Sequence, residues 1–397
     1  NGEWGERKRR AAKQGLVLRR AGALLRGRCS CGPATENGEE SASLSSQASG
    51  ISEENELSEE ESEGLSVTDM MGRTVTVPAG AESFICIGPG CLRLYCYVAD
   101  ESQLAGVEEV EKSWGEEGRP YRMALEDADS METIGPGGPG NAPDAEMLFA
   151  AGADVIFTTY ALESSEIDEL QERIMTPVVA LSYGEASLFS EEVDQSLELI
   201  GQITGNEARA EELIQYFANA KADLEARSAD AEDPPTVYLG CQSHQGSHGI
   251  ESTTGDYPLF DALNARNVVA EAGIHEYVSL DKEKLLEMDP DVLVIDAGGL
   301  SILQEDYASN PDFYNSLSAV QNGNVYLQMP FNYYDTNIEI ALADAYYIGT
   351  VLYPEEFSNI DPAEKFDEIT REMLGIDAYD RIAAAYFGGY QTVTLGQ

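Results

Sequence analysis

Two of the three histidines in this chain stand close to a carboxylate, and these residue types bind metals. His244, His248 and Glu251 are spaced as His-x3-His-x2-Glu, and imidazole and carboxylate groups are common ligands of zinc. A helix would bring such groups together on one face, but Gly246 and Gly249 make a helix improbable here. Three interpretations therefore remain: direct metal ligation by His248 or Glu251, contact with a bound ligand, and a structural role.

Tyrosines supply a second kind of chemistry, because a phenolate can coordinate ferric iron and a phenol ring can stack on a chelator. Tyr333 and Tyr334 lie in the loop 330–337, directly after a predicted strand. Tyr160 and Tyr183 each follow a predicted strand in the first half of the chain. We take all four as candidate ligand-binding residues. The alternative for the adjacent pair is that one ring packs inward and the other points outward.

Two glycine-rich loops could bring backbone N–H groups to a ligand. The loop 88–90 precedes a predicted helix, whose N-terminus attracts anions, and the loop 135–141 carries four glycines. Neither is a nucleotide motif, because the first lacks the third glycine of a dinucleotide fingerprint and the second lacks the Lys and Ser/Thr of a phosphate loop. The alternative for the second loop is a turn-rich connection. The candidate ligand-binding positions here are Gly88, Gly90, Cys91, Gly137 and Gly138.

Arg119 and Arg122 are among the few cations in this part of the chain. An arginine in so acidic a chain could neutralise a carboxylate, a catecholate or an oxyanion through charge-assisted hydrogen bonds. We therefore include Arg122 among the candidate ligand-binding residues. The alternative is that both arginines are solvated loop residues.

The six cysteines do not have the paired spacing of a zinc site, and no disulfide framework can be read from them. Cys86, Cys91 and Cys96 fall on a predicted strand and the helix after it. We expect them to be small buried apolar residues.

Composition excludes several classes of protein. The chain has 397 residues, room for two domains of ordinary size, and a net charge of −48. So acidic a chain would be repelled by a phosphate backbone, which argues against nucleic-acid binding. No apolar run approaches the roughly 18 residues that a membrane-spanning helix needs.

The first 64 residues differ from the rest. Residues 1–32 combine a basic stretch, a weakly apolar stretch and then Cys29 and Cys31, the order of a bacterial lipoprotein signal, although arginines interrupt the apolar part. We expect a degraded leader with Cys29 or Cys31 as the lipidation site, or else a basic tail. Because the first residue is Asn, we expect the start of the chain to be incomplete. Residues 33–64 are rich in Ser and Glu and should form a disordered acidic linker.

An internal repeat predicts the architecture. A helix from 145, an Asp-containing turn and the apolar strand 155–157 are matched by a helix from 282, a similar turn and the strand 292–295. Apolar strands that alternate with helices indicate parallel sheets covered on both faces. Between the two units we predict helices over 190–203 and 207–227. The second carries an apolar stripe and is long enough to brace two lobes.

We therefore predict an α/β fold with two Rossmann-like lobes, joined by one long helical linker, and a ligand cleft between them at the carboxyl ends of the strands. The predicted boundaries are 65–185 for the N-terminal lobe, 186–232 for the linker and 233–397 for the C-terminal lobe with its closing helices.

The region from about Leu65 to Gly389 resembles the substrate-binding proteins of ABC importers for iron-siderophores, haem, cobalamin and molybdate, the class with a helical hinge. The resemblance rests on the opening segment 69–73, the paired helix-to-strand segments, the helical linker, and the closing run 341–349 with Tyr353-Pro354. It implies a rigid hinge, modest closure of the lobes, and docking onto a membrane permease through surface carboxylates.

From this resemblance we expect a binding protein and not an enzyme, in the form of a monomer outside the cytoplasm, either periplasmic or anchored as a lipoprotein. Its partners would be an ABC permease and its ATPase. Few cations and several tyrosines favour an iron complex such as a siderophore or haem. The alternatives are a molybdate or tungstate oxyanion in the same fold and, in another class, a metal-dependent hydrolase using His244, His248 and Glu251.

Overall fold

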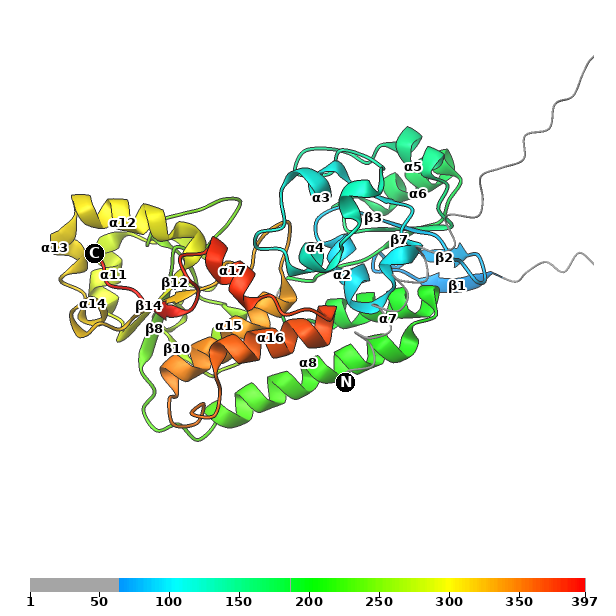
Figure 1. Ribbon diagram of the computed structural model, residues 1–397. Helices are drawn as coiled ribbons and strands as arrows, with labels where there is room; N and C mark the ends of the chain where they lie inside the picture. The colour runs from blue at the N-terminus through cyan, green and yellow to red at the C-terminus, as the bar shows by residue number, and fades with distance from the viewer. Residues whose placement is uncertain (1–63, 186, 397) are drawn as a thin grey trace, which may run out of the picture.

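The structure is a computed structural model and describes residues 64–185 and 187–396. The expected leader, with Cys29 and Cys31, and nearly all of the expected acidic linker lie outside the described residues. Two α/β lobes lie side by side along one long helix (Figure 1). Within the described residues, no helix is both long and apolar enough to cross a bilayer.

The first lobe contains two parallel sheets, β3-β6-β7 and β4-β5, which an isolated bridge links into the order β5-β4-β3-β6-β7. β4 joins β3 because the Ala105 N–H donates to the Phe84 carbonyl. In chain order this is 3-2-1-4-5, the order of a doubly wound sheet, whose ligand crevice lies where the winding reverses, here between β3 and β6. A separate hairpin, β1 with β2, opens the lobe. The strands are β1 (Leu65–Thr68), β2 (Thr74–Val77), β3 (Phe84–Ile87), β4 (Gly106–Val107), β5 (Glu132–Thr133), β6 (Val155–Thr158) and β7 (Val178–Ala180).

The second lobe repeats this plan with the order β10-β8-β12-β13-β14. Its winding reverses between β8 and β12, and all pairs are parallel except the antiparallel edge strand β14, which the sequence did not predict. β9 and β11 form a small antiparallel pair beside the sheet. The strands are β8 (Thr236–Gly240), β9 (Ser252–Thr254), β10 (Arg266–Asn267), β11 (Tyr277–Ser279), β12 (Val292–Asp296), β13 (Val325–Gln328) and β14 (Gln391–Thr392).

The aspartates of the two repeated turns do the same job in each lobe. The Asp154 carboxylate accepts the N–H of Ser83, 3.0 Å away, just before β3. The Asp291 carboxylate accepts the N–H of Thr236, 2.9 Å away, at the start of β8. Each aspartate thus satisfies a backbone donor at the amino end of the neighbouring strand. The repeat therefore reflects a shared structural requirement, and the predicted pair of parallel-sheet lobes is confirmed.

Helices cover both sheets. In the first lobe they are α2 (Cys91–Val98), α3 (Glu109–Ser113), α4 (Pro120–Ala124), α5 (Ala145–Ala151) and α6 (Ser164–Ile174). In the second lobe they are α9 (Pro258–Asp261), α10 (Val268–Glu271), α11 (Lys282–Met288), α12 (Leu300–Ser309), α13 (Pro311–Tyr314), α14 (Ser318–Asn322), α15 (Ile338–Leu352), α16 (Pro362–Leu374) and α17 (Tyr379–Ala385).

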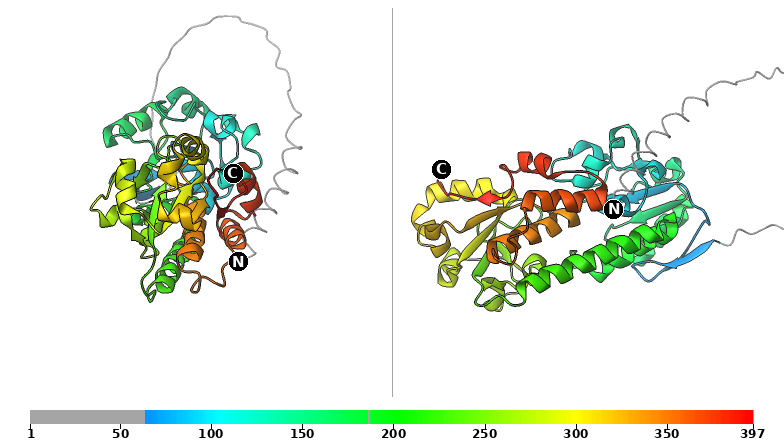
Figure 2. Two further views of the ribbon diagram at one scale, coloured as in Figure 1. Left: turned by 90° about the vertical axis from the view of Figure 1, so that its left-hand side faces the viewer. Right: turned by 60° about the horizontal axis from the view of Figure 1, so that its bottom comes forward.

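The helical linker consists of α7 (Glu191–Thr204) and α8 (Glu207–Ser228), which pack on each other. Gly205, in the left-handed conformation at φ 71°, ends α7 and lets the chain turn into α8. The predicted apolar stripe of α8 is buried, and α8 runs along both lobes (Figure 2). Its 22 residues span about 33 Å.

The C-terminal helices also connect the lobes. α16 packs against α15 of the second lobe and against α2 and α4 of the first. The largest apolar cluster runs from α2 and α7 through α8 into α15 and α16. Because this core is continuous, separating the lobes completely would expose buried apolar surface.

Candidate ligand site between the lobes

A buried glutamate lies where the winding of the first sheet reverses. Glu108 directly follows β4 and is 3% exposed. One carboxylate oxygen accepts the Tyr160 hydroxyl at 2.7 Å, and the other accepts the Gly88 N–H at 3.0 Å. Burial raises the pKa of Glu108, and the hydrogen bonds from Tyr160 and Gly88 oppose that shift. The crevice of the first lobe therefore centres on a carboxylate.

The loop 330–337 of the second lobe reaches into this crevice. The Tyr334 hydroxyl donates to the Glu108 carboxylate at 3.0 Å and accepts the Gly138 N–H at 3.0 Å. The Tyr333 hydroxyl donates to the Trp114 carbonyl at 3.2 Å. The Trp114 ring meets the Tyr334 ring edge-on, with 5.2 Å between centroids. Both adjacent tyrosines therefore contact the first lobe.

A fully buried arginine fixes the backbone of that loop. The five N–H donors of the Arg93 guanidinium make five hydrogen bonds, and the side chain is 0% exposed. Four of the five acceptors belong to the second lobe, and the fifth is the Tyr183 hydroxyl. The second-lobe acceptors are the Asn337 side-chain oxygen and the carbonyls of Tyr333, Tyr334 and Thr336. With every donor engaged, Arg93 positions the loop and has no free N–H for a ligand.

The glycine loop 88–90 is held by Tyr183, whose hydroxyl also accepts a hydrogen bond from Arg93. Gly90 precedes α2 at φ 71°, and its carbonyl accepts the Tyr183 hydroxyl at 3.0 Å. Tyr183 is buried beneath the crevice, so its hydroxyl contacts protein groups. Cys91 is buried as the first residue of α2, in agreement with the expected small apolar role of the cysteines.

The switch point of the second lobe also holds a buried acid. Asp296, at the end of β12, is 4% exposed and accepts the N–H groups of Ser243 and Gly298 at 3.1 and 2.8 Å. Burial raises the pKa of Asp296 to about 6. The Asn332 side chain donates to the Ser243 carbonyl at 3.4 Å. The loop 330–337 therefore touches the switch points of both lobes.

The histidine segment forms no metal centre with its neighbours. A ring nitrogen of His248 lies 2.7 Å from the His244 carbonyl, and the His244 ring stacks on Tyr277. No helix forms there, as the two glycines led us to expect. Within the described residues, no group of three or more His, Cys, Asp or Glu side chains is placed to hold a metal ion. Contact of His248 or Glu251 with a ligand stays a prediction.

The two arginines of the α3–α4 region are buried and paired with protein groups. Arg119 lies 2.7 Å from the Glu111 carboxylate, and Arg122 donates to the carbonyls of Glu111 and Leu125. Glu111 is also buried, which raises its pKa, and the charge of Arg119 opposes this shift. The alternative of solvated loop arginines is wrong, because Arg119 is 0% and Arg122 3% exposed.

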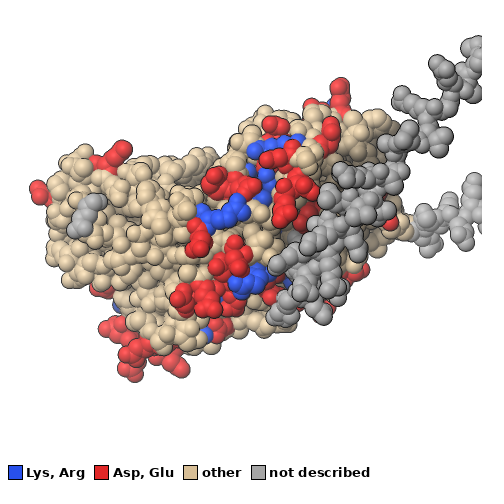
Figure 3. Space-filling model, viewed as in Figure 1, with Lys and Arg blue, Asp and Glu red and all other residues tan. Residues whose placement is uncertain are grey.

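Arg122 also lines a pocket of about 500 Å³ between the lobes, together with Lys112 and Arg381. Acidic side chains of Glu116, Glu117 and Asp129 share its wall. Figure 3 shows basic and acidic side chains intermixed over this middle part of the surface. The pocket is thus of mixed charge and lies beside the Trp114–Tyr333 contact without including it.

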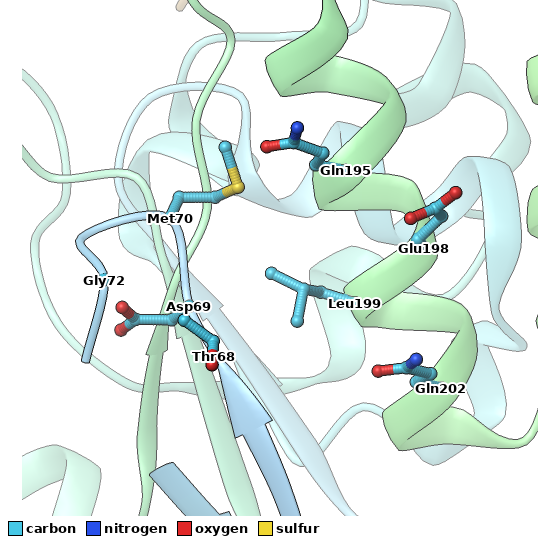
Figure 4. A pocket seen from close by; sticks show the side chains of 8 residues that line it. All are labelled: Thr68, Asp69, Met70, Gly72, Gln195, Glu198, Leu199 and Gln202. Atoms are coloured by element: carbon cyan, nitrogen blue, oxygen red, sulfur yellow. The ribbon is translucent and has the colours of Figure 1, made fainter. Parts of the chain in front are cut away.

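A second pocket, of about 430 Å³, lies away from both switch points. It is formed by the turn after β1 and by α7, with Asp69, Met70, Gln195 and Leu199 among its walls (Figure 4). The Asp69 carboxylate is paired with Arg73 at 2.7 Å. No predicted ligand residue lies in this pocket.

The structure thus brings together Gly88, Gly138, Tyr160 and Tyr334 around one carboxylate. It places Gly90, Cys91 and Tyr183 in the layer beneath them and Tyr333 at their edge. Gly137 packs against Glu108, since a Cβ there would lie 2.9 Å from the Glu108 Cβ. Arg122, His248 and Glu251 lie elsewhere. Sequence reasoning missed Glu108, Arg93, Trp114 and Asn337. A signal existed only for Glu108, which directly follows an apolar strand as ligand residues of doubly wound sheets do.

Known proteins resemble this chain in sequence and in fold. The model of a family described as periplasmic binding protein matches residues 102–330. An Fe(3+)-citrate-binding protein of Bacillus subtilis is 25% identical over 189 residues, which are 48% of this chain and 58% of that protein. An uncharacterized ABC transporter substrate-binding lipoprotein of the same organism is 20% identical over 185 residues, 46% of this chain and 57% of that protein. The chain thus spans little more than half the length of these relatives.

Solved structures share the fold. The molybdate-binding protein MolA of Haemophilus influenzae superposes with a TM-score of 0.60 at 20% identity, covering 79% of this chain and 98% of that one. A solute-binding protein of Veillonella parvula superposes with a TM-score of 0.64 at 15% identity, covering 81% and 96%. With a family of binding proteins matched over more than half of its length, and with the two-lobed fold such proteins have, this chain belongs to the periplasmic binding protein family.

Proposed function

We propose that this chain is the solute-binding component of an ABC importer and that it captures an iron complex, such as a siderophore or haem, outside the cytoplasm. The proposal rests on one observation above all. The loop 330–337 of one lobe meets the carboxyl ends of the strands of the other lobe, at the position where doubly wound sheets bind ligands. The hydrolase alternative is dropped, because the family consists of binding proteins.

The side chains around this position favour a metal complex over a bare oxyanion. Trp114, Tyr160, Tyr333 and Tyr334 bring aromatic rings together here, and such rings suit an organic chelator. The Gly88 N–H, which could have bound molybdate, already donates to Glu108. A buried carboxylate beside an oxyanion would repel it. The iron-citrate protein among the relatives supports the same choice.

Cargo delivery requires partners. We propose an ABC permease with its ATPase as those partners. We also propose a monomeric binding protein whose membrane anchor is a lipid on Cys29 or Cys31. The acidic surface offers many carboxylates for docking, and genes for a permease and an ATPase beside this one would support the assignment.

Calorimetric titration of the purified full-length chain tests the ligand. Ferric citrate, haemin and molybdate are titrated separately, and native mass spectrometry identifies anything that copurifies. We expect saturable binding of a ferric complex and no heat with molybdate. Binding of molybdate without any ferric complex would assign the chain to oxyanion import, and binding of none of the three would refute the proposed cargo.

A further inference from the structure

Glu108 and Gly138 together form a subsite that a single hydroxyl fills. The Gly138 N–H needs an acceptor, and Glu108 Oε2, which already accepts the Gly88 N–H, can take a second donor. The Tyr334 hydroxyl meets both groups at 3.0 Å. Glu108 is 3% exposed with Tyr334 in place, so the phenol covers the carboxylate. A side chain from the opposite lobe thus occupies the polar centre of the first lobe's crevice.

The backbone under this tyrosine is strained. Tyr334 has φ 51° and Asp335 has φ 70°, two consecutive non-glycine residues in the left-handed region. Such conformations are unfavourable for residues with a side chain and persist where surrounding contacts impose them, often at functional sites. Here the contacts are the bonds from Arg93 to the carbonyls of Tyr333 and Tyr334. The carbonyls are fixed, whereas the Tyr334 ring is held by its hydroxyl and by the edge of Trp114.

We propose that Tyr334 occupies the ligand subsite from within and that the ligand displaces its ring, presenting to Glu108 and Gly138 a hydroxyl or another group that both donates and accepts a hydrogen bond. This inference rests on the proposed binding function and narrows the ligand class. Neutral or cationic groups with a donor fit the subsite, and bare oxyanions do not, because they offer Glu108 no proton. Displacement occurs by rotation of the side chain while Arg93 retains the backbone.

Trp114 reports this event. The chain has two tryptophans, Trp4 and Trp114, so Trp4→Phe leaves a single indole, whose ring lies against Tyr334. Movement of the Tyr334 ring should change the Trp114 emission. The probe is p-cresol, which is the side chain of tyrosine, and 4-methylanisole is its matched partner without a donor.

The variants Tyr334→Phe and Tyr334→Ala are compared with the parent in the Trp4→Phe background. We expect p-cresol to bind Tyr334→Phe roughly five- to a hundredfold more tightly than the parent, the equivalent of the two internal hydrogen bonds that the Tyr334 hydroxyl makes. Tyr334→Ala should bind it more tightly still. 4-Methylanisole should bind each protein more weakly than p-cresol does, and molybdate should leave the emission unchanged.

Tyr390→Phe is the matched control, because the Tyr390 hydroxyl also donates to a buried carboxylate, that of Asp344, at 2.8 Å. It should bind p-cresol like the parent. The inference is overturned if Tyr334→Phe and the parent bind p-cresol equally, if the methylated probe binds as well as p-cresol, or if molybdate binds better than p-cresol.

A measurement without ligand gives an independent result. Tyr334→Ala should make Trp114 more accessible to acrylamide quenching, and Tyr390→Phe should not; equal quenching in both variants would contradict the proposed contact. The proposed cargo and the proposed displacement of Tyr334 can be contradicted independently of each other. If the cresol results hold but no ferric complex binds, the proposed cargo is wrong and the occupied subsite stands. If a ferric complex binds and the Tyr334 variants behave like the parent, only the displacement is wrong.

Discussion

Arg93 and Asn337 lie 244 positions apart in the chain, and the Arg93 Nε donates to the Asn337 side-chain oxygen at 3.0 Å in a fully buried contact. Asn337 immediately precedes α15, and Arg93 lies on α2, so this bond joins one helix of each lobe. Glu339, buried nearby, accepts the Tyr97 hydroxyl from the same α2 helix. A polar interface of this kind fixes the relative position of the lobes, because each group would be unsatisfied without its partner.

Replacement of Arg93 should therefore be costly. Arg93→Met leaves Glu339 without its nearby positive charge and several carbonyls without donors, and we expect unfolding in urea to require about 3–5 kcal/mol less free energy. Arg93→Lys should lose less but not recover the parent value, because an ammonium has three donors and no planar fork. The control is Arg266→Lys, at an exposed pair with Glu271, where we expect a change below about 1 kcal/mol. Equal losses at both positions would contradict the role of Arg93.

Gly90 should not tolerate a side chain. Its φ is 71°, and a Cβ would lie 2.5 Å from the Tyr183 hydroxyl oxygen. Gly90→Ala therefore adds a steric clash to backbone strain, and we expect a loss of about 2–3 kcal/mol in the free energy of unfolding. Gly80 is the control, because it has φ 72° and no atom near the position of an added Cβ. Gly80→Ala therefore introduces backbone strain without a clash and should cost about 1 kcal/mol. A smaller loss at Gly90 than at Gly80 would show that Tyr183 yields easily.

Asp296 should make the fold less stable as the pH rises. Burial raises its folded pKa to about 6, so between about pH 4 and pH 6 the folded state keeps a proton that the unfolded chain has already lost. This contribution is present at low pH and disappears as the pH rises through about 6. Asp296→Asn removes this contribution. The free energy of unfolding of the variant, relative to that of the parent, should therefore rise by on the order of 2 kcal/mol between pH 4 and pH 7. Urea titrations at several pH values measure the difference.

Asp291, at the other end of β12, is the control of opposite sign. Hydrogen bonds from the Thr236 backbone and side chain lower the pKa of Asp291. Its contribution is therefore present at neutral pH and is lost as the pH falls through the folded pKa. Asp291→Asn should be less stable than the parent at pH 7, with a gap that narrows on acidification. If the free energy of unfolding of the two variants changed with pH in the same way, the pKa directions given for Asp296 and Asp291 would both be contradicted.

The cysteines of the described part should resist thiol reagents in the native state. Cys86, Cys91, Cys96 and Cys241 are buried, and burial raises the pKa of Cys86 and Cys241. In a variant with Cys29→Ser and Cys31→Ser, we expect negligible reaction with a chromogenic disulfide reagent until denaturant is added, and then four thiols. Rapid native labelling of any of the four would show that its lobe opens locally.

Much of the architecture could be predicted because its signals are local. The apolar strand 292–295, the helix from 282 and the turn at Asp291 appear in the structure within a residue or two. The stripe of α8 predicted a buried face because spacings of three and four residues place side chains on one side of a helix. The antiparallel edge strand β14 was missed because two residues carry no periodicity.

The site depended on contacts that no local pattern records. Hydrophobic periodicity and turn residues act over a few positions, so they predict two parallel-sheet lobes, a helical linker and loops at the carboxyl ends of strands. They do not indicate which of 72 acidic residues lies at the site. Glu108 acquires its character from burial and from Tyr334, 226 positions away, and both follow from how the lobes pack against each other.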